Sequence, residues 1–386
     1  MVTATIIHSA RLVSDGAETG DAWVELHGGT IAAVGTCESW RSRPASATII
    51  DASEVAGPGA ILTPGFVDLH GHGGGGFSYE GDGADIRAAR ALHLAHGTTR
   101  AVLSLVSGSL EHLTEQVARI AAMTKTDAGI LGSHLEGPFL DPGHRGAHDP
   151  AALRAATPDA VAALLEAGAG TIRQVTLAPE LPGAADAIRA FREVGVCVAV
   201  GHTDADLEAT RAAFEAGASI LTHAFNAMPP LHHRAPGPVG AATADARVTL
   251  EVIADGVHVH PELIRILFAA APGRIALVTD AMAAAGAGDG RYVLGELEVD
   301  VVDGVARIAG TDTIAGSTLT QDAALRVAVG AGVDLADALG ALTVVPARAV
   351  GRPDLGILAP GHAADAVLLD ASLTVRAVWC DGHRVQ

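Results

Sequence analysis

The central part of the chain alternates between short apolar runs rich in β-branched residues and longer alanine-rich stretches. Eight apolar runs follow one another, and they end near His70, Leu105, Glu136, Glu180, Thr203, Asn226, Asp255 and Asp280. Helical patterns such as residues 84–95, 204–216 and 261–270 lie between them. Because strands that alternate with helices form parallel sheets, eight such units predict an α/β fold, a (β/α)8 barrel of the TIM type over residues 59–354. In such barrels, functional groups gather at the carboxyl ends of the strands.

Both ends of the chain show a different pattern of short strands broken by turns. Candidate strands cover residues 5–7, 22–26, 30–34 and 48–51 at one end, and 366–369 and 375–379 at the other. We expect residues 1–58 and 355–386 to pair in one small β-sandwich domain. Within the barrel region, strand-like residues flank Asp303-Gly304, which predicts a β-hairpin insertion near residues 291–310.

Composition supports a large folded core and narrows the class of partner. Hydrophobic residues make up 49% of the 386 residues and charged residues 18%. The 44 acidic and 25 basic residues give a formal charge of −19, which repels a phosphate backbone and argues against nucleic-acid binding. No apolar run approaches about 18 residues, and no basic segment precedes an apolar one at the start, so we expect neither a membrane span nor a signal peptide. We therefore expect a cytoplasmic protein.

The chain is poor in lysine and cysteine and rich in histidine. Its single lysine, Lys125, follows no glycine-rich loop, which argues against a P-loop, a Schiff-base lysine and a carbamylated-lysine metal bridge. The three cysteines are far apart and form no C-x-x-C motif, so neither a disulfide framework nor a cysteine zinc site is expected. The chain has 18 histidines, and many of them lie beside Gly, Asp or Pro at the ends of apolar runs.

His70 and His72 close the first apolar run, immediately before Gly73 to Gly76. Side chains two residues apart on a strand point the same way, so the two imidazoles can bind one metal ion. The alternative is that both histidines are hydrogen-bonded in a glycine-rich turn and bind nothing.

A carboxylate and two further histidines occupy matching positions at other strand ends. Glu136 closes the third run before Gly137-Pro138, while His202 and His223 close the fifth and sixth. One glutamate and two histidines are ligands that Zn²⁺ or Fe²⁺ accepts, with a coordination position left for water. Glu136 alone could equally cap the segment that follows it.

Asp280 closes the eighth run, at the same mouth of the predicted barrel. An aspartate beside a metal-bound water can accept its proton and later pass that proton to a leaving amine. The alternative role is an N-cap for the next helix.

This series of residues resembles the metal-site residues of the amidohydrolase superfamily. The sequence motifs around them resemble those of one family within it. HLEGPF at 134–139, GHTD at 201–204, THAFNAM at 222–228, ADGVH at 254–258 and AGSTLT at 315–320 are similar to motifs of the N-acetylglucosamine-6-phosphate deacetylases, in the same order. The resemblance covers nearly the whole chain. It implies the metal-dependent hydrolysis of N-acetyl-D-glucosamine 6-phosphate to D-glucosamine 6-phosphate and acetate, in amino-sugar catabolism and cell-wall recycling.

The resemblance also assigns roles to residues of this chain. Glu136, His202 and His223 would hold the main divalent ion, and His70 and His72 would build a second site that Glu136 can bridge. Zinc is the expected metal, with iron, manganese or cobalt as alternatives and one or two ions per subunit. Asp280 would be the catalytic proton carrier, and His148 would donate to the acetamide carbonyl.

The implied substrate contacts surround these residues. They are Ala147, His148, Asn226, Ala227, Arg234, Asp255, His258, Ile314, Ala315 and Gly316. Arg234 lies in a proline-rich segment, residues 228–239, and is expected to reach the substrate phosphate of a neighbouring subunit in a homodimer. It could instead be an ordinary surface arginine.

Two other functions stay open. Another amidohydrolase acting on a cyclic amide or a dipeptide would use the same metal but no phosphate site. A non-catalytic amidohydrolase-like binding protein usually lacks metal ligands, whereas every ligand position is filled in this chain.

Overall fold

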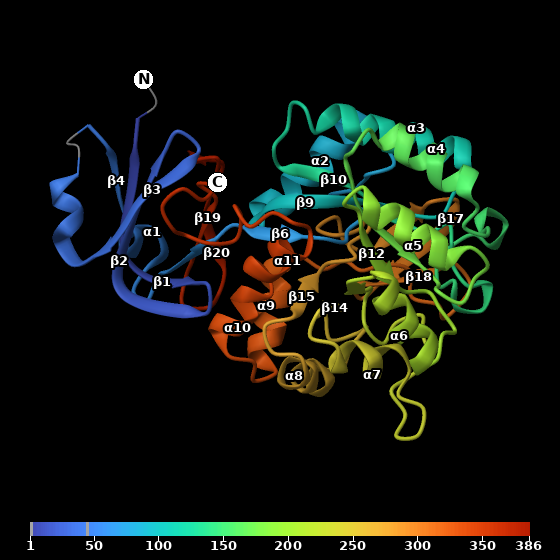
Figure 1. Ribbon diagram of the computed structural model, residues 1–386. Helices are drawn as coiled ribbons and strands as arrows, with labels where there is room; N and C mark the ends of the chain where they lie inside the picture. The colour runs from blue at the N-terminus through green and yellow to red at the C-terminus, as the bar shows by residue number, and fades with distance from the viewer. Residues whose placement is uncertain (1–2, 44–45) are drawn as a thin grey trace.

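The computed structural model describes residues 3–43 and 46–386, which form a barrel with a second sheet at its side (Figure 1). Eight strands build the barrel as one parallel sheet in chain order. They are β6 (Phe66–Asp68), β9 (Thr98–Leu105), β10 (Ile130–Glu136), β11 (Ile172–Leu177), β12 (Cys197–Val200), β13 (Ile220–Leu221), β14 (Thr249–Ile253) and β15 (Ile275–Val278). The eight predicted strand–helix units and the parallel barrel are confirmed.

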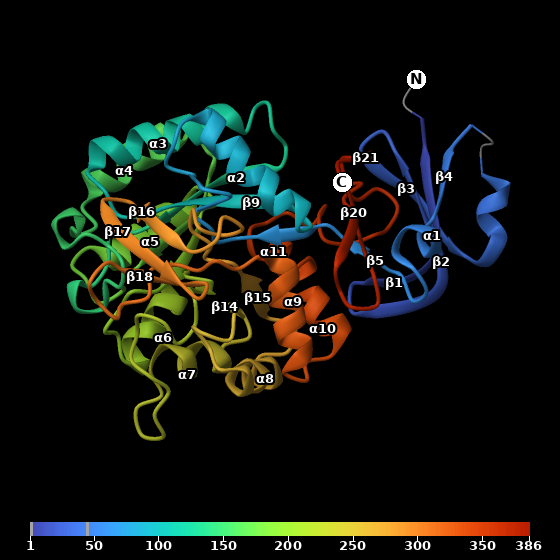
Figure 2. The same ribbon diagram turned by 180° about the vertical axis from the view of Figure 1, so that it is seen from behind.

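Helices surround this sheet and cover the outer face of its strands (Figure 2). They are α2 (Gly83–Ala95), α3 (Leu110–Met123), α4 (Pro158–Gly168), α5 (Ala184–Glu193), α6 (Leu207–Ala216), α7 (Gly237–Ala244), α8 (Pro261–Ala270), α9 (Gln321–Gly330), α10 (Leu335–Gly340) and α11 (Val344–Ala349). Helix α6 begins later than the expected residue 204, because Asp206 is its N-cap and accepts from the N–H of Ala209.

Strands β6 and β15 stand at the two ends of the sheet order, and single contacts join them. The N–H of Asp280 donates to the carbonyl of His70 over 2.8 Å. The hydroxyl of Thr279 donates to Asp68 over 2.6 Å, and the amide of Gln321 donates to the carbonyls of both Val67 and Leu277. The seam that closes the barrel therefore fixes the first and last strand ends relative to each other.

Both chain ends build the second sheet, as expected. Its strands are β1 (Thr5–Ser14), β2 (Ala17–His27), β3 (Thr30–Thr36), β4 (Thr48–Asp51), β5 (Ile61–Pro64), β19 (Ala366–Leu369), β20 (Val375–Cys380) and β21 (His383–Arg384). The short helices η1 (Cys37–Ser42) and α1 (Ala52–Ala56) accompany them. Strand β1 pairs with β4 along its first half and with β5 further on. Its pairing with β2 contains two register shifts. Residues of these strands form an apolar core separate from that of the barrel. Strand β5, beyond the expected limit at residue 58, pairs within this sheet.

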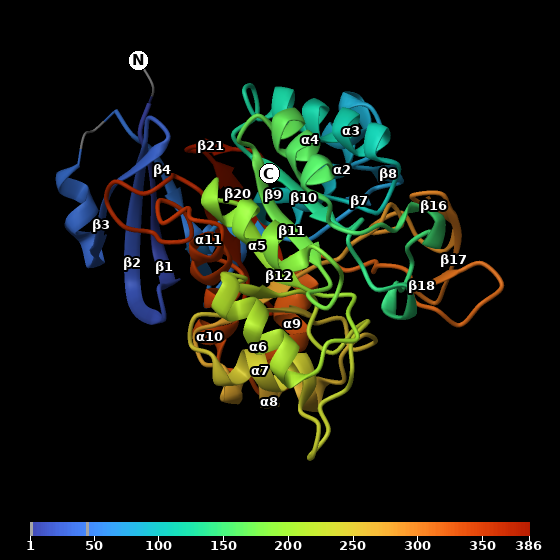
Figure 3. The same ribbon diagram turned by 45° about the vertical axis from the view of Figure 1, so that its right-hand side comes forward.

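The insertion after β15 contains three antiparallel strands rather than two. They are β16 (Gly290–Leu294), β17 (Leu297–Val302) and β18 (Val305–Ile308). The turn at Asp303-Gly304 was expected, but a second turn at Gly295-Glu296 splits the long apolar run before it, with Gly295 at a φ of +56°. The inner face of this sheet packs on Val106 and Met282, which places the insertion beside the barrel mouth (Figure 3).

Smaller elements complete the loops at the mouth. They are β7 (Gly73–Gly74), β8 (Phe77–Ser78), η2 (Pro142–His144) and η3 (Pro150–Ala152). Among the residues that the structure describes, no helix is long and apolar enough to cross a membrane.

Candidate active site

The carboxyl ends of five barrel strands bring the expected metal ligands and Asp280 together. His70 and His72 follow β6, Glu136 ends β10, His202 follows β12, His223 follows β13 and Asp280 follows β15, and all six side chains are buried. All of them except His70 line a cavity of about 430 Å³ that opens at the barrel mouth. The site thus occupies the end of the barrel where functional groups are expected.

Glu136 is the centre of the arrangement. Its Oε1 lies 3.1 Å from Nε2 of His202 and 3.1 Å from Nε2 of His223, and these two nitrogens are 2.9 Å apart. Ligands about 2.0 to 2.1 Å from a tetrahedral ion stand roughly 3.3 Å from one another, so the three atoms are spaced as ligands of one ion.

The ring of His202 is oriented for such a role. Its Nδ1 lies 2.9 Å from the carbonyl of His144, and a carbonyl can only accept, so Nδ1 carries the proton. Nε2 is then left with its lone pair toward Glu136 and His223. This is the tautomer that a metal ligand needs.

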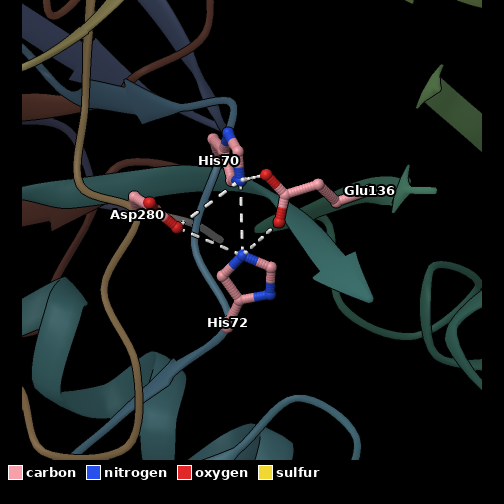
Figure 4. Close-up of side chains that lie close together, drawn as sticks. All are labelled: His70, His72, Glu136 and Asp280. Atoms are coloured by element: carbon pink, nitrogen blue, oxygen red, sulfur yellow. Dashed lines mark hydrogen bonds and ion pairs between the residues drawn. The ribbon is translucent and has the colours of Figure 1, made fainter. Parts of the chain in front are cut away.

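A second cluster shares Glu136 with the first (Figure 4). Nε2 of His72 lies 3.1 Å from Oε2 of Glu136 and 3.2 Å from Oδ1 of Asp280. Nε2 of His70 lies 3.2 Å from Oε1 of Glu136, 3.5 Å from Oδ1 of Asp280 and 3.3 Å from Nε2 of His72. Oε1 of Glu136 thus lies near His202, His223 and His70, and Oε2 lies near His72, so this one carboxylate contacts both clusters.

The buried carboxylates favour positive charge at this site. Burial lowers the pKa of His72, but hydrogen bonds to Asp280 and Glu136 outweigh it and raise the pKa to about 9. Burial raises the pKa of Asp280, but the charge of His70 and the hydrogen bond with His72 lower it to about 2. Two ionised carboxylates surrounded by imidazoles form a donor set suited to a divalent cation.

Three of these residues have a backbone conformation that L-amino acids seldom adopt. The φ angles are +49° for His202, +24° for His223 and +48° for Asp280. Such conformations cost energy and persist where the surrounding structure enforces them, often at functional sites. Here they end the strands early, so β12 and β13 stop at Val200 and Leu221, before the residues where the apolar runs were expected to end.

His148 enters the site from the loop after β10. The backbone N–H of Ser107 donates to its Nδ1 over 3.1 Å, so in the neutral ring Nε2 carries the proton. Burial lowers the pKa of His148 to about 4, which keeps the ring neutral at neutral pH. Its Nε2 lies 3.5 Å from Oε2 of Glu136, so the N–H donor is directed into the cavity.

Most of the expected substrate contacts line the cavity. They are Ala147, His148, Asn226, Ala227, His258, Ile314 and Gly316. Asp255 lies behind His258, with its Oδ2 2.6 Å from Nδ1 of that histidine. Ala315 is fully buried and packs into the core of the insertion.

Arg234 lies away from the cavity of its own chain. It occupies the exposed tip of a hairpin in which His232 and Ala235 pair, and this yellow-green loop projects from the body (Figure 1). The residues that line the cavity, all in the described part of the chain, include no arginine or lysine. They do include the acidic residues Glu136, Asp280 and Asp312.

Sequence reasoning missed several residues of the cavity wall. They are Val106, Gly143, His144, Gly146, Leu294, Asp312 and Thr313. Gly143 to Gly146 directly precede the expected contacts Ala147 and His148, so their position in the same loop is a usable signal for them. Leu294 comes from the insertion, and only its tertiary packing brings it to the mouth.

Comparison with known proteins agrees with this geometry. Residues 61–385 match the model of the amidohydrolase family. N-acetylgalactosamine-6-phosphate deacetylase of Escherichia coli O157:H7 is 38% identical over 98% of each chain, and N-acetylglucosamine-6-phosphate deacetylase of Bos taurus is 40% identical over 85% of this chain and 84% of its own. A structure of N-acetyl-D-glucosamine-6-phosphate deacetylase from Mycobacterium smegmatis, in complex with N-acetyl-D-glucosamine 6-phosphate, shares 42% identity and a TM-score of 0.93 over 99% of both chains. The chain therefore belongs to the amidohydrolase family.

Proposed function

We propose that this protein hydrolyses the N-acetyl group of N-acetyl-D-glucosamine 6-phosphate to give D-glucosamine 6-phosphate and acetate, in amino-sugar catabolism and cell-wall recycling. The observation that carries the proposal is the convergence of Glu136, His202 and His223 within 3.1 Å of one another, in a cavity that Asp280 and His148 also face. The names of the relatives supply the substrate class. Since the substrate is a phosphorylated sugar of central metabolism, we place the enzyme in the cytoplasm.

The donor set fits one or two divalent ions, with zinc as the expected metal. Glu136, His202 and His223 would hold the first ion, and His70 and His72 would hold a second, with Glu136 shared between them. A divalent ion bound there supplies a Lewis acid for the acetamide carbonyl and lowers the pKa of a water molecule.

Asp280 would move the proton in this reaction. Its carboxylate would accept a proton from the attacking water as the new C–O bond forms, and would donate it to the sugar nitrogen as the C–N bond breaks. Its low pKa suits the first step, because a general base must begin ionised. Glucosamine 6-phosphate and acetate are then the products.

His148 would stabilise the charge that develops on the carbonyl oxygen. The Ser107 N–H keeps the proton of its neutral ring on Nε2, which faces the cavity. A donor fixed before the reaction needs no reorganisation as the oxyanion forms.

Within the described residues, the cavity of one chain offers no arginine or lysine to the phosphate. His258, hydrogen-bonded to Asp255, is the basic group that this chain would supply. We propose that the enzyme is a homodimer in which Arg234 on the projecting hairpin completes the phosphate site of the neighbouring subunit. The hairpin contains Pro229, Pro230 and Pro236, which restrict its backbone and reduce the entropy lost on docking.

The test is an acetate-release assay on N-acetylglucosamine 6-phosphate, with and without a chelator. We expect turnover that the chelator abolishes and zinc restores, and much weaker turnover of unphosphorylated N-acetylglucosamine. No acetate from the metal-loaded protein would refute the proposal. Comparable rates with and without the phosphate would favour a different amidohydrolase substrate, such as a cyclic amide or a dipeptide.

N-acetylgalactosamine 6-phosphate is a second candidate substrate. The Escherichia coli O157:H7 relative, which matches 98% of this chain, is named as an N-acetylgalactosamine-6-phosphate deacetylase. The two sugars differ only in the configuration at one ring carbon, so kcat/KM measured on both identifies the preferred one.

A further inference from the structure

A fully buried carboxylate lies behind the metal ligands, on the side away from the cavity. Glu251 belongs to β14 and has no solvent exposure. Its Oε2 lies 3.1 Å from Nδ1 of His70, and its Oε1 accepts from the amide of Gln174 over 2.7 Å. The backbone N–H of His223 also points to Oε2, at 3.4 Å. Neither the lining of the cavity nor the proposed chemistry uses Glu251.

The groups around Glu251 form a polar layer inside the barrel. His134 contacts the hydroxyls of Ser104 at 2.9 Å and Thr176 at 2.8 Å, and its ring lies edge-on to His70. Burial lowers the pKa of His134 well below its ordinary value, so this ring is neutral. The ring nitrogen of His70 is the one ionisable donor with a hydrogen bond to Glu251 in the described part of the chain.

The direction of the hydrogen bond between His70 and Glu251 determines which nitrogen of His70 carries a proton. A carboxylate only accepts hydrogen bonds, so Nδ1 of His70 carries a proton toward Glu251. Nε2, on the opposite side of the ring, then points at Glu136 and Asp280. His72 differs, because within the described residues its buried Nδ1 has no hydrogen-bond partner. Of these two histidines, therefore, only His70 has a hydrogen-bond partner for its Nδ1 among the described residues.

We infer that Glu251 is a positioning residue that fixes the tautomer and orientation of His70 and so builds the second cation site of this centre. The inference rests on the proposed metal-dependent function and deepens it. A carboxylate behind a metal-binding imidazole orients the ring and increases the basicity of the coordinating nitrogen. The first ion depends less on Glu251, because only the backbone of His223 contacts that carboxylate.

The test is a titration of metal-free protein with Zn²⁺, followed by calorimetry and by elemental analysis. We expect two ions per chain in the wild type. Glu251→Gln preserves the volume of the side chain but replaces one carboxylate oxygen with an NH₂ group. Gln174 and His70 both donate to Glu251, so one of these donors loses its acceptor. We expect the second ion to bind about 10- to 100-fold more weakly and the first with nearly unchanged affinity.

Gln174→Met is the matched control. It disturbs the same buried layer and removes one hydrogen bond from Glu251, but leaves the carboxylate free to hold His70. It should keep both ions. An unchanged second site in Glu251→Gln, an equal loss in Gln174→Met, or a single ion in the wild type would each overturn the inference.

A second measurement needs no variant. Long-range ¹H–¹⁵N correlations on the zinc-loaded wild type report which nitrogen of His70 is protonated. A proton on Nδ1 supports the inference, and a proton on Nε2 overturns it even if Glu251→Gln does not fold. Neither readout depends on the substrate, so a protein that binds two ions but releases no acetate would refute the proposed function alone.

Discussion

The backbone N–H of Ser107 donates to Nδ1 of His148 over 3.1 Å, and this bond leaves the proton of the neutral ring on Nε2, which lies 3.5 Å from Oε2 of Glu136. A neutral imidazole has one donor and one acceptor. With Nδ1 accepting, Nε2 cannot offer a lone pair to a metal ion, although Glu136 and His202 lie within ligand distance of it. The bond therefore favours a hydrogen-bond donor over a metal ligand at this position.

Replacing His148 separates these two roles. We expect His148→Ala to lower kcat about 10²- to 10³-fold, as the loss of one oxyanion donor does elsewhere, while the bound metal stays at the wild-type level. Acetate release and elemental analysis on one preparation give both values. Loss of metal together with activity would make His148 a ligand instead.

Asp280 faces the cavity with an ionised carboxylate. We expect Asp280→Asn to reduce kcat by roughly 10² to 10⁴, because the amide can neither accept the proton of water nor return it. Substrate affinity, measured by calorimetry, should change little. A variant that kept more than about a tenth of the wild-type kcat would contradict the assigned role.

The sequence predicted most of this architecture because its signals are local. Alternating apolar and alanine-rich segments identify strand–helix units, and the order of the units determines where the strand ends meet. The sequence alone therefore places His202, His223 and Asp280 at one mouth of the barrel. Their positive φ angles were not predictable, since non-glycine residues adopt them only where tertiary contacts hold them.

Other features depended on contacts between distant segments. In the sequence, Glu251 is one polar residue inside an apolar strand. No nearby residue indicates that it contacts His70 across the barrel. Leu294 reaches the cavity only because the insertion packs on Val106. The position of Arg234 outside its own cavity likewise became visible only in the folded chain.

Gly146 lies in the loop after β10, close to the ring of His202. A Cβ at this glycine would stand 3.2 Å from Cε1 of His202, and its φ is +54°. We expect Gly146→Ala to shift the ring of His202 and weaken binding of the first ion about tenfold or more. Gly170 is the control, because it also has a positive φ, +80°, but open space around its Cα. If Gly170→Ala lost as much metal, backbone strain rather than contact with His202 would be the cause.

The Asp255–His258 pair predicts how substrate affinity depends on pH. Burial lowers the pKa of His258, but the hydrogen bond and charge of Asp255 outweigh burial and raise it above 6.5. A raised pKa keeps the imidazolium charge to higher pH than in an ordinary histidine, and the charge is lost as pH rises through that pKa. KM for the 6-phosphate should therefore increase on the alkaline side, whereas KM for N-acetylglucosamine should not.

Asp255→Asn provides the corresponding variant. Without the carboxylate, the pKa of His258 should fall, so the increase in KM should begin at lower pH than in the wild type. A KM profile that is the same in both proteins would show that His258 does not bind the phosphate. Metal content, measured at each pH, controls for loss of the ion.

Arg234 should contribute to the affinity for phosphate and little else. A charge-assisted contact is worth about 1.5 to 3 kcal/mol, so Arg234→Ala should raise KM for the 6-phosphate roughly 10- to 150-fold. KM for N-acetylglucosamine and the content of metal should stay near their wild-type values. The neighbouring His233→Ala, on the same exposed tip, controls for damage to the hairpin.

Mixed dimers decide whether Arg234 acts in its own subunit or in its neighbour. Arg234→Ala subunits lack the phosphate contact, and Asp280→Asn subunits lack the proton carrier. If Arg234 acts across the interface, a heterodimer of the two contains one site with an intact Asp280 from one chain and an intact Arg234 from the other. At substrate concentrations far below the KM of Arg234→Ala, such heterodimers should regain about half of the wild-type rate, measured after purification with two different affinity tags. Verified heterodimers that stay as inactive as the parent variants would mean that Arg234 acts within its own subunit or has no role in binding phosphate.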